Sequence, residues 1–218
     1  MTAVIFDLDG TLIDSAPAIH ALSNAVLTAR GFAPLTRDEV QGFVGKGVPH
    51  LVRSLLARHG QDPDGPLFAP VQADLLSRYE TQVEGNTLYP GVAEALAELS
   101  AQGCALAIAT NKPLRPALAV LRHVGLAELF PVVLGGDSLP SRKPDPAMLH
   151  EARRRLGRAP ALYVGDSEVD AEAAANAGWP FLLFTEGYRK SPVAALPHAA
   201  AFSRFADLPA LVAAWSKR

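Results

Sequence analysis

The 218-residue sequence has little of several features that would point to particular classes of protein. It holds one cysteine, Cys104, so no disulfide can form within the chain, as is typical of cytoplasmic proteins. No apolar run is long enough to span a bilayer, and the start of the chain has no basic segment followed by a cleavage site. We therefore expect a soluble, cytoplasmic protein with no membrane partner.

An excess of charge of one sign is also missing. The 20 Lys and Arg residues nearly balance the 22 Asp and Glu residues. Such a chain has no large positive field with which to hold a nucleic acid by releasing its counterions. Hydrophobic residues make up 49% of the chain, which is sufficient for one substantial core and a small second lobe. We expect no nucleic-acid partner, and a monomer or a homodimer.

Short apolar runs that are typical of buried strands recur along the chain, and each ends in a polar cluster. They are Val4–Phe6, Leu106–Ile108, Val132–Leu134, Leu162–Val164 and Phe181–Phe184. Amphipathic stretches with helical spacing alternate with them, at Val92–Leu99, Pro116–Val124, Pro146–Leu156 and Val169–Ala177. This alternation predicts an α/β fold with a doubly wound, Rossmann-like parallel sheet.

Residues 16–87 interrupt the alternation because they hold only helical patterns. Ile19, Leu22 and Val26 share one helical face, and Thr36 with Glu39 fits a capping box. The proline- and glycine-rich segment from Gln61 to Pro70 is expected to be a loop. We predict an all-helical cap at residues 16–87, inserted into an α/β core that comprises residues 1–15 and 88–218.

Polar residues follow several of the predicted strands and point to a common site. They are Asp7, Asp9, Thr110, Asn111, Lys112, Asp166 and Asp170, with Lys143 on a loop. The carboxyl ends of the strands of a doubly wound sheet meet in one crevice, so these side chains should lie together. Two carboxylates 4 Å apart repel by about 4 kcal/mol at an effective dielectric of roughly 20. Oxygen ligands without Cys or His favour Mg²⁺ over zinc as the compensating cation.

This set of residues suits the transfer of a phosphoryl group. Asp7 can attack phosphorus and form a covalent intermediate when a cation and Lys143 screen the repulsion between anions. Asp9 can protonate the leaving oxygen and then activate the attacking water. Thr110 and the backbone N–H groups of the turn at Leu8 and Asp9 can hold the nonbridging oxygens.

Four segments carry a resemblance to a known family. Phe6–Leu12, Thr110–Pro113, Lys143–Pro146 and Gly165–Asp170 resemble, in order, the four signature motifs of the haloacid dehalogenase superfamily. That superfamily inserts its cap between the first and second motifs, where the helical lobe lies here. The carboxylate at Asp9 is the feature that favours phosphatases and phosphomutases within the superfamily over dehalogenases.

The resemblance implies roles for individual residues. Asp7 would be the nucleophile and a metal ligand, and Asp9 the acid and base that also binds the metal through its backbone carbonyl. Asp166 would be the second carboxylate ligand. Asp170 would support the metal site directly or through water, and Lys143 would pin Asp7 and the phosphoryl group.

A finer resemblance is to phosphoglycolate phosphatases. It is carried by Thr110–Pro113, by the cap loop Val44–Gly47 and by the pair Gly187-Tyr188, whereas the following Arg189–Pro192 commonly differs in that family. It implies that 2-phosphoglycolate is hydrolysed to glycolate and phosphate, and it adds Asn111 and Lys46 to the substrate-binding candidates. Lys46 could equally lie in a flexible exposed loop, because glycines flank it.

Other functions stay open at this point. A phosphatase of sugar phosphates, nucleotides or pyrophosphate would share these motifs, and so would a phosphomutase. A receiver-type signalling domain also uses a phosphorylated aspartate and magnesium, but such domains are shorter and uncapped. Single motifs also have structural explanations, since Asp9-Gly10 could be a turn and Ser167 a helix cap. Helix capping would leave Asp170 unexplained.

Overall fold

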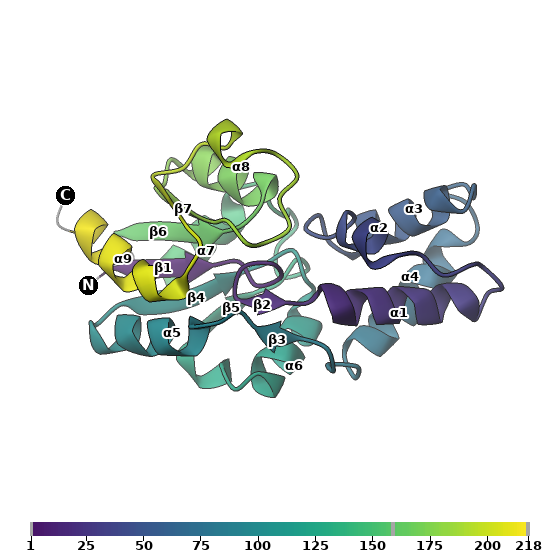
Figure 1. Cartoon of the computed structure of the whole chain (residues 1–218), viewed down its shortest axis with the longest axis horizontal. Coiled ribbons are helices and arrows are strands. Elements are labelled where there is room, and N and C mark those ends of the chain that lie inside the picture. The colour runs from purple at the N-terminus through teal and green to yellow at the C-terminus, as the bar shows by residue number, and fades with distance from the viewer. Residues whose placement is uncertain (1, 158–159, 217–218) are drawn as a thin grey trace.

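The computed structural model describes residues 2–157 and 160–216, which form a larger and a smaller lobe (Figure 1). The larger lobe contains a six-stranded sheet in the order β5-β4-β1-β6-β7-β8, and every neighbouring pair is parallel. Its strands are β1 (Ala3–Phe6), β4 (Ala105–Ala109), β5 (Val132–Leu134), β6 (Ala161–Gly165), β7 (Phe181–Phe184) and β8 (Ala200–Phe202). The predicted doubly wound α/β fold is confirmed.

Helices cover both faces of the sheet, which explains why its strands are apolar on both sides. In β1, Val4 and Phe6 join the apolar cluster on one face, whereas Ala3 and Ile5 join the cluster on the other. Helices α5 (Val92–Ala101), α6 (Leu114–His123) and α9 (Leu208–Ser216) pack on the first face, and α7 (Ala147–Arg155) and α8 (Glu168–Ala177) on the second. Short 3₁₀ turns lie at Ala127–Leu129, Val193–Ala195 and Phe205–Asp207.

The smaller lobe is helical and has an apolar core of its own. It comprises α1 (Ala16–Thr28), α2 (Arg37–Gln41), α3 (Val48–Arg58) and α4 (Phe68–Tyr79). The capping box forms as expected, because Thr36 N–H donates to Glu39 and Glu39 N–H donates to Thr36. The loop predicted for Gln61–Pro70 is too long. Helix α4 begins at Phe68, and Pro70 lies in its first turn, where a missing N–H costs nothing.

A two-stranded antiparallel ribbon connects the lobes. It pairs β2 (Ile13–Asp14) with β3 (Thr87–Leu88), two residues from each side, which is too short for the sequence pattern to reveal. The range predicted as the helical cap, residues 16–87, therefore ends in a strand residue, Thr87. The domain limits at 15/16 and 87/88 otherwise stay a prediction.

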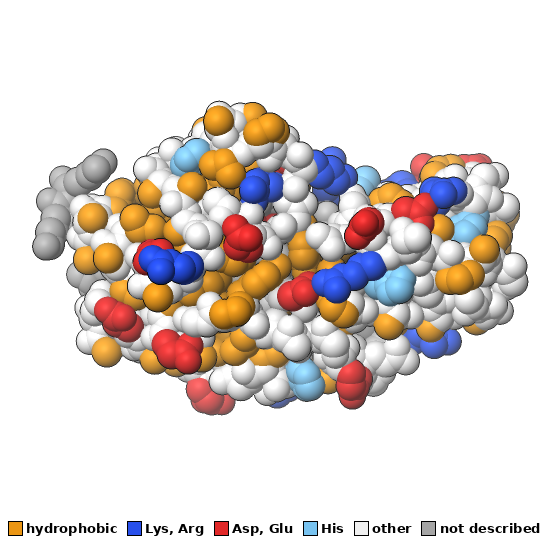
Figure 2. Space-filling view, in the orientation of Figure 1, with side chains coloured by type: hydrophobic (Ala, Val, Ile, Leu, Met, Phe, Trp, Pro, Cys, Tyr) orange, Lys and Arg blue, Asp and Glu red, His pale blue; other side chains and the backbone are white. Residues whose placement is uncertain are grey.

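The distribution of surface charge and the length of the apolar helices relate to the expected absence of nucleic-acid and membrane partners. Figure 2 shows basic and acidic side chains interspersed over both lobes on the visible face, without a large field of one sign. Within the residues that the structure describes, no helix combines the length and the apolarity needed to traverse a bilayer.

Candidate active site

Asp7 lies immediately after β1, in the middle of the sheet. Its backbone N–H donates to Val164 O at 2.9 Å and so continues the ladder beyond the strand. The ammonium of Lys143 lies 2.9 Å from Asp7 Oδ1 and 2.7 Å from Asp170 Oδ1, and its Nζ donates to the hydroxyl of Tyr163. The structure thus brings together four side chains from three segments of the chain, all of them buried.

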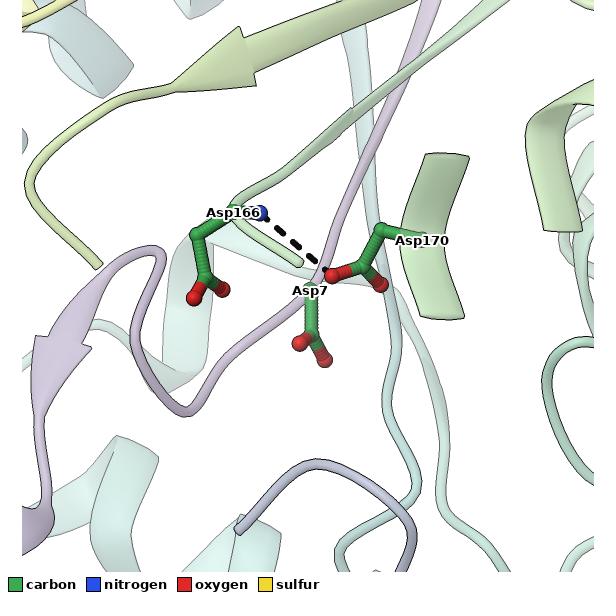
Figure 3. Close-up of side chains that lie close together, drawn as sticks. All are labelled: Asp7, Asp166 and Asp170. Carbon is green, nitrogen blue, oxygen red and sulfur yellow. Dashed lines mark hydrogen bonds between the residues drawn. The ribbon is translucent and has the colours of Figure 1, made fainter. Parts of the chain in front are cut away.

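Asp166 completes a group of three carboxylates at this edge. Oxygens of Asp7, Asp166 and Asp170 lie within 4.8 Å of one another. Figure 3 shows that Asp7 comes from the loop after β1, Asp166 from the loop after β6 and Asp170 from α8. Asp166 accepts hydrogen bonds from Thr11 Oγ1 and from the backbone N–H of Tyr188, both at 2.7 Å. These bonds fix its carboxylate on the side facing Asp7.

The electrostatics of this group are unbalanced. Burial raises the pKa of Asp7 to about 7, with Asp170 adding to the rise and Lys143 opposing it. Burial, together with Asp170 and Asp7, raises the pKa of Asp166 well above its ordinary value. Burial would also raise the pKa of Asp170, but Lys143 outweighs it and the pKa is lowered. One ammonium therefore faces three carboxylates and balances the charge of only one.

The residues present fit a divalent cation. When Asp7 and Asp166 ionise, no further ammonium compensates their charge, and Asp7 Oδ1 accepts no hydrogen bond of good geometry from any described residue. Both oxygens of Asp170 are already engaged, one by Lys143 and Tyr163 and the other by Ser167. Asp166 accepts one hydrogen bond from an uncharged donor on each oxygen, and no described lysine or arginine pairs with it. Asp7 and Asp166 are therefore the carboxylates best placed to hold a metal ion, and Asp170 is placed to support them.

Asp170 has two structural tasks at once. Its Oδ2 accepts from the N–H and hydroxyl of Ser167 at the start of α8, which is half of a capping box. Its Oδ1 accepts from Lys143 and Tyr163. The expectation that capping leaves Asp170 unexplained is wrong, because one carboxylate both caps the helix and neutralises Lys143.

Two glycines leave the space that Asp166 occupies. A Cβ on Gly10 would lie 2.6 Å from Asp166 Oδ2, and Gly10 has a φ of +87°, which disfavours any other residue. A Cβ on Gly187 would lie 2.3 Å from Asp166 Cβ. The Asp9-Gly10 turn and the Gly187-Tyr188 pair are therefore parts of the same site, since both enclose this carboxylate.

Asp9 has a partner, Lys112, that the sequence analysis placed in the same crevice but to which it gave no role. Lys112 Nζ lies 3.0 Å from Asp9 Oδ1 and 3.4 Å from Oδ2, and the same ammonium lies 4.4 Å from the ring centroid of Tyr79 in the cap. Lys112 is buried. The signal available in the sequence was its position three residues after β4, beside Thr110.

The side chains of the remaining residues of the second motif, Thr110 and Asn111, form hydrogen bonds within the protein. Thr110 is buried, and its hydroxyl accepts the N–H of Lys112 at 3.2 Å. Asn111 donates to Gly45 O and to Lys143 O and accepts the Lys143 N–H, each at 3.0 Å. Asn111 therefore ties the cap loop to the loop that carries Lys143. Its predicted contact with substrate stays a prediction.

Leu8 and Lys46 complete the predicted set. The side chain of Leu8 is fully buried, and its carbonyl accepts from Thr11, Leu12 and Ile13, so that only its backbone can serve the site. Lys46 is exposed on the cap loop, on the wall of a cavity that Asp7, Asp9 and Asp166 also line. It is near the other residues without contacting the carboxylates.

Tyr188 links the acidic group to the entrance of the cap. Its hydroxyl accepts from the N–H groups of Ser15 and Ala16 and donates to Asp14 Oδ1 at 2.8 Å. Asp14 also pairs with Arg37 of the cap, at 2.9 Å. The sequence analysis used Tyr188 only as a family marker, and nothing in its local pattern reveals these contacts.

Known proteins resemble this chain along its whole length. It is 64% identical to a phosphoglycolate phosphatase of Rhodobacter capsulatus over 98% of both chains. Its fold matches that of a predicted phosphoglycolate phosphatase from Haemophilus somnus, with a TM-score of 0.89 and 30% identity over 96% of this chain and 97% of the other. CbbY of Rhodobacter sphaeroides in complex with phosphate matches with a TM-score of 0.81 and 26% identity, over 94% and 95%.

The family model for haloacid dehalogenase-like hydrolases matches residues 1–178, which include all four motifs and every residue of the acidic group. The structural match and the sequence relatives agree with it over most of the chain. The chain belongs to the haloacid dehalogenase-like hydrolase family.

Proposed function

We propose that this protein is a magnesium-dependent phosphatase that hydrolyses 2-phosphoglycolate to glycolate and phosphate through an aspartyl-phosphate on Asp7. The observation that carries the chemistry is the position of Asp7, which faces a buried ammonium and two further carboxylates at one sheet edge. The high identity to a phosphoglycolate phosphatase supports the choice of substrate. A cytoplasmic location and a monomeric or homodimeric state complete the proposal.

The residues of this chain divide the reaction between them. Asp7 attacks phosphorus, the bond from phosphorus to the leaving oxygen breaks, and Asp9 donates a proton to that oxygen. Water then attacks the aspartyl-phosphate while Asp9 takes up the proton, and Asp7 is regenerated with release of phosphate. Lys143, held in place by Asp170 and Tyr163, offsets charge on Asp7 and on the phosphoryl oxygens.

Magnesium, held by Asp7, Asp166 and the backbone carbonyl of Asp9 and supported by Asp170, would supply positive charge that screens the two anions. Burial suits this arrangement, because charge interactions strengthen where water is excluded. Thr110 and the backbone N–H groups of Leu8 and Asp9 would hold the nonbridging oxygens. Asn111 and Lys46 would position the substrate. Lys46 would do so from the cap, which comprises residues 16–87.

A sugar phosphate is the second candidate substrate. CbbY has the same fold, and a solved complex of it contains xylulose-1,5-bisphosphate, at 26% identity to this chain and a TM-score of 0.80. A phosphomutase is the corresponding alternative in reaction type. The receiver-type signalling domain is excluded by the capped fold and by the family match.

Release of inorganic phosphate from a panel of substrates tests the proposal. The panel contains 2-phosphoglycolate, sugar phosphates, nucleotides and pyrophosphate, each with magnesium and with a chelator. We expect the highest kcat/KM for 2-phosphoglycolate and no release in the chelator. A preference for a sugar phosphate would overturn the substrate, and isomerised sugar phosphate without free phosphate would reveal a mutase.

A further inference from the structure

Two buried lysines each face one of the two aspartates of the first motif. Lys143 faces Asp7 and has Asp170 as a second carboxylate partner. Lys112 faces Asp9, and among the described residues Asp9 is the one carboxylate with which it forms an ion pair. Its other neighbour is the ring of Tyr79. Among the described residues, Lys112 thus has a single anionic partner, and that partner is the proposed acid and base, Asp9.

The ion pair is buried on both sides. The side chains of Lys112 and Asp9 are 3% and 10% exposed. Burial alone lowers the pKa of Lys112, but Asp9 and Tyr79 outweigh it and the pKa is raised, so the ammonium stays charged. A buried charge that loses its only anionic partner is strongly destabilised. If Asp9 turns toward a leaving oxygen, Lys112 therefore needs another anion.

The cavity beside Lys112 offers one positive charge to an anion. Asp7, Asp9, Tyr79, Thr110 and Lys112 line it, and the cap closes it with apolar residues that include Phe43 and Leu51. Of the described residues on its wall, Lys112 is the one with a positive charge. An anionic group that enters this cavity beyond the phosphoryl position meets Lys112 and otherwise mostly apolar surface.

We propose that Lys112 is the specificity-determining residue that binds the carboxylate of the substrate. On binding, the ion pair of Lys112 with Asp9 is replaced by an ion pair of Lys112 with this carboxylate. This proposal rests on the proposed function, because the substrate then carries a carboxylate one carbon from its phosphate ester. The exchange satisfies Lys112 and leaves the Asp9 side chain free for the leaving oxygen. The ring of Tyr79 holds the ammonium in place from the cap side.

Lys46 is the competing cation. It is exposed on the cap loop and lines a neighbouring cavity, together with Lys190. Water and salt weaken the attraction of an exposed ammonium for a carboxylate, whereas the buried Lys112 is screened much less. Lys46 therefore serves as the matched control, a lysine near the same carboxylates that differs from Lys112 in its burial.

The test compares 2-phosphoglycolate with 2-phosphoglycolamide, in which an uncharged amide replaces the carboxylate and the phosphate is unchanged. The readout is the ratio of their kcat/KM values, from which effects common to both substrates cancel. We expect Lys112→Met to lower this ratio roughly 10- to 100-fold, as for loss of a buried charge-assisted hydrogen bond, and Lys46→Met to change it far less. A thermal unfolding curve checks that each variant is folded, and Lys112→Gln replaces Lys112→Met if the latter is not.

The outcomes separate the two proposals. A wild-type enzyme that does not prefer 2-phosphoglycolate over the amide would overturn the substrate assignment itself, and with it the exchange. A wild-type preference that survives in Lys112→Met, or that is lost equally in Lys46→Met, would overturn the role of Lys112 alone.

Discussion

The carboxyl edge of the sheet and the cap that faces it differ in what they bury. The sheet edge buries Asp7, Asp166 and Asp170 with oxygens within 4.8 Å of one another, and Lys143 pairs with Asp7 and Asp170. The cap buries an apolar cluster, and between residues 16 and 87 its buried polar side chains are Ser23 and Asn86. The first region is held together against repulsion between its own carboxylates, whereas the second is stabilised by ordinary apolar burial.

This difference indicates which residues serve the proposed chemistry and which serve mainly the stability of the fold. At the sheet edge, the groups that we propose for the chemistry are also groups whose mutual repulsion disfavours folding when no cation is bound. In the cap, most of the buried residues have no chemical role, and contact with the site passes through the cap loop and Tyr79. Substitutions in the two regions should therefore have different effects on activity and stability.

The largest effect is expected from Asp7→Asn. The amide cannot attack phosphorus, so phosphate release should fall by about four orders of magnitude or more, as when other nucleophiles are removed. Phosphate release over time, with 2-phosphoglycolate and magnesium, measures it. Asp38→Asn, an exposed cap position, is the control and should leave the rate unchanged. Activity of Asp7→Asn near the wild-type rate would refute the covalent mechanism.

Lys143→Met should produce the largest loss of stability. It leaves Asp7 and Asp170 buried without their cation, which typically costs about 3–5 kcal/mol. Chemical denaturation at pH 7.5 in a chelator measures the free energy of unfolding. Lys190→Met, on the exposed rim, is the control. A variant as stable as the wild type would show that the carboxylates do not depend on this ammonium.

Leu55→Ala should destabilise the cap without altering the chemistry. Leu55 is fully buried in the cap cluster, and such truncations cost roughly 2–5 kcal/mol. At a temperature where the variant is folded, kcat should stay close to that of the wild type because the catalytic residues lie in the core. Leu76→Ala, at a partly buried position of the same cluster, should cost less. A large fall in kcat with intact folding would contradict the separation.

The pH dependence of stability offers a finer test of the sheet edge. The pKa of Asp7 rises from 3.8 to about 7 on folding without metal, so the folded state binds more protons between these pH values. Its contribution to stability is present below about pH 4 and is lost as the pH rises through 7. In a chelator, Asp7→Asn should therefore gain stability over the wild type with rising pH, by about 4 kcal/mol between pH 4 and pH 8.

Free energies of unfolding of Asp7→Asn and the wild type, measured from pH 4 to pH 8, test whether the pKa of Asp7 is raised. A constant difference between Asp7→Asn and wild type over the whole range would show that Asp7 is not perturbed. Added magnesium should reduce the difference at high pH, because it stabilises the charged form of Asp7.

The smallest effect is expected from Arg37→Ala at the junction of the two regions. The Arg37 side chain is 49% exposed in its pair with Asp14, and such pairs contribute about 0–1 kcal/mol. Arg58→Ala removes a comparable exposed pair within the cap and is the matched control. Thermal unfolding measures both. A clearly larger loss for Arg37→Ala would show that the contact with Asp14 and Tyr188 couples the lobes.

Much of the core could be predicted from the sequence because its signals are local. Five strands are apolar runs that end in polar residues, and all five are observed. Strand β8 and helix α9 were not predicted, since Ala200–Phe202 is a short run and Leu208–Ser216 has no clear periodic polar face. The ribbon of β2 and β3 was not predicted either, because each of its strands has only two residues.

The sequence by itself determined the order of the motifs, the cap insertion and the residue types of the site, because each depends on neighbours along the chain. The tertiary structure alone decided which side chains pair: Lys112 with Asp9 and Tyr79, and Tyr188 with Asp14 and the loop that leads into the cap. These contacts join residues 33 to 174 positions apart. Local periodicity carries no information about such distances, since only the packing of the cap and the sheet brings these residues together.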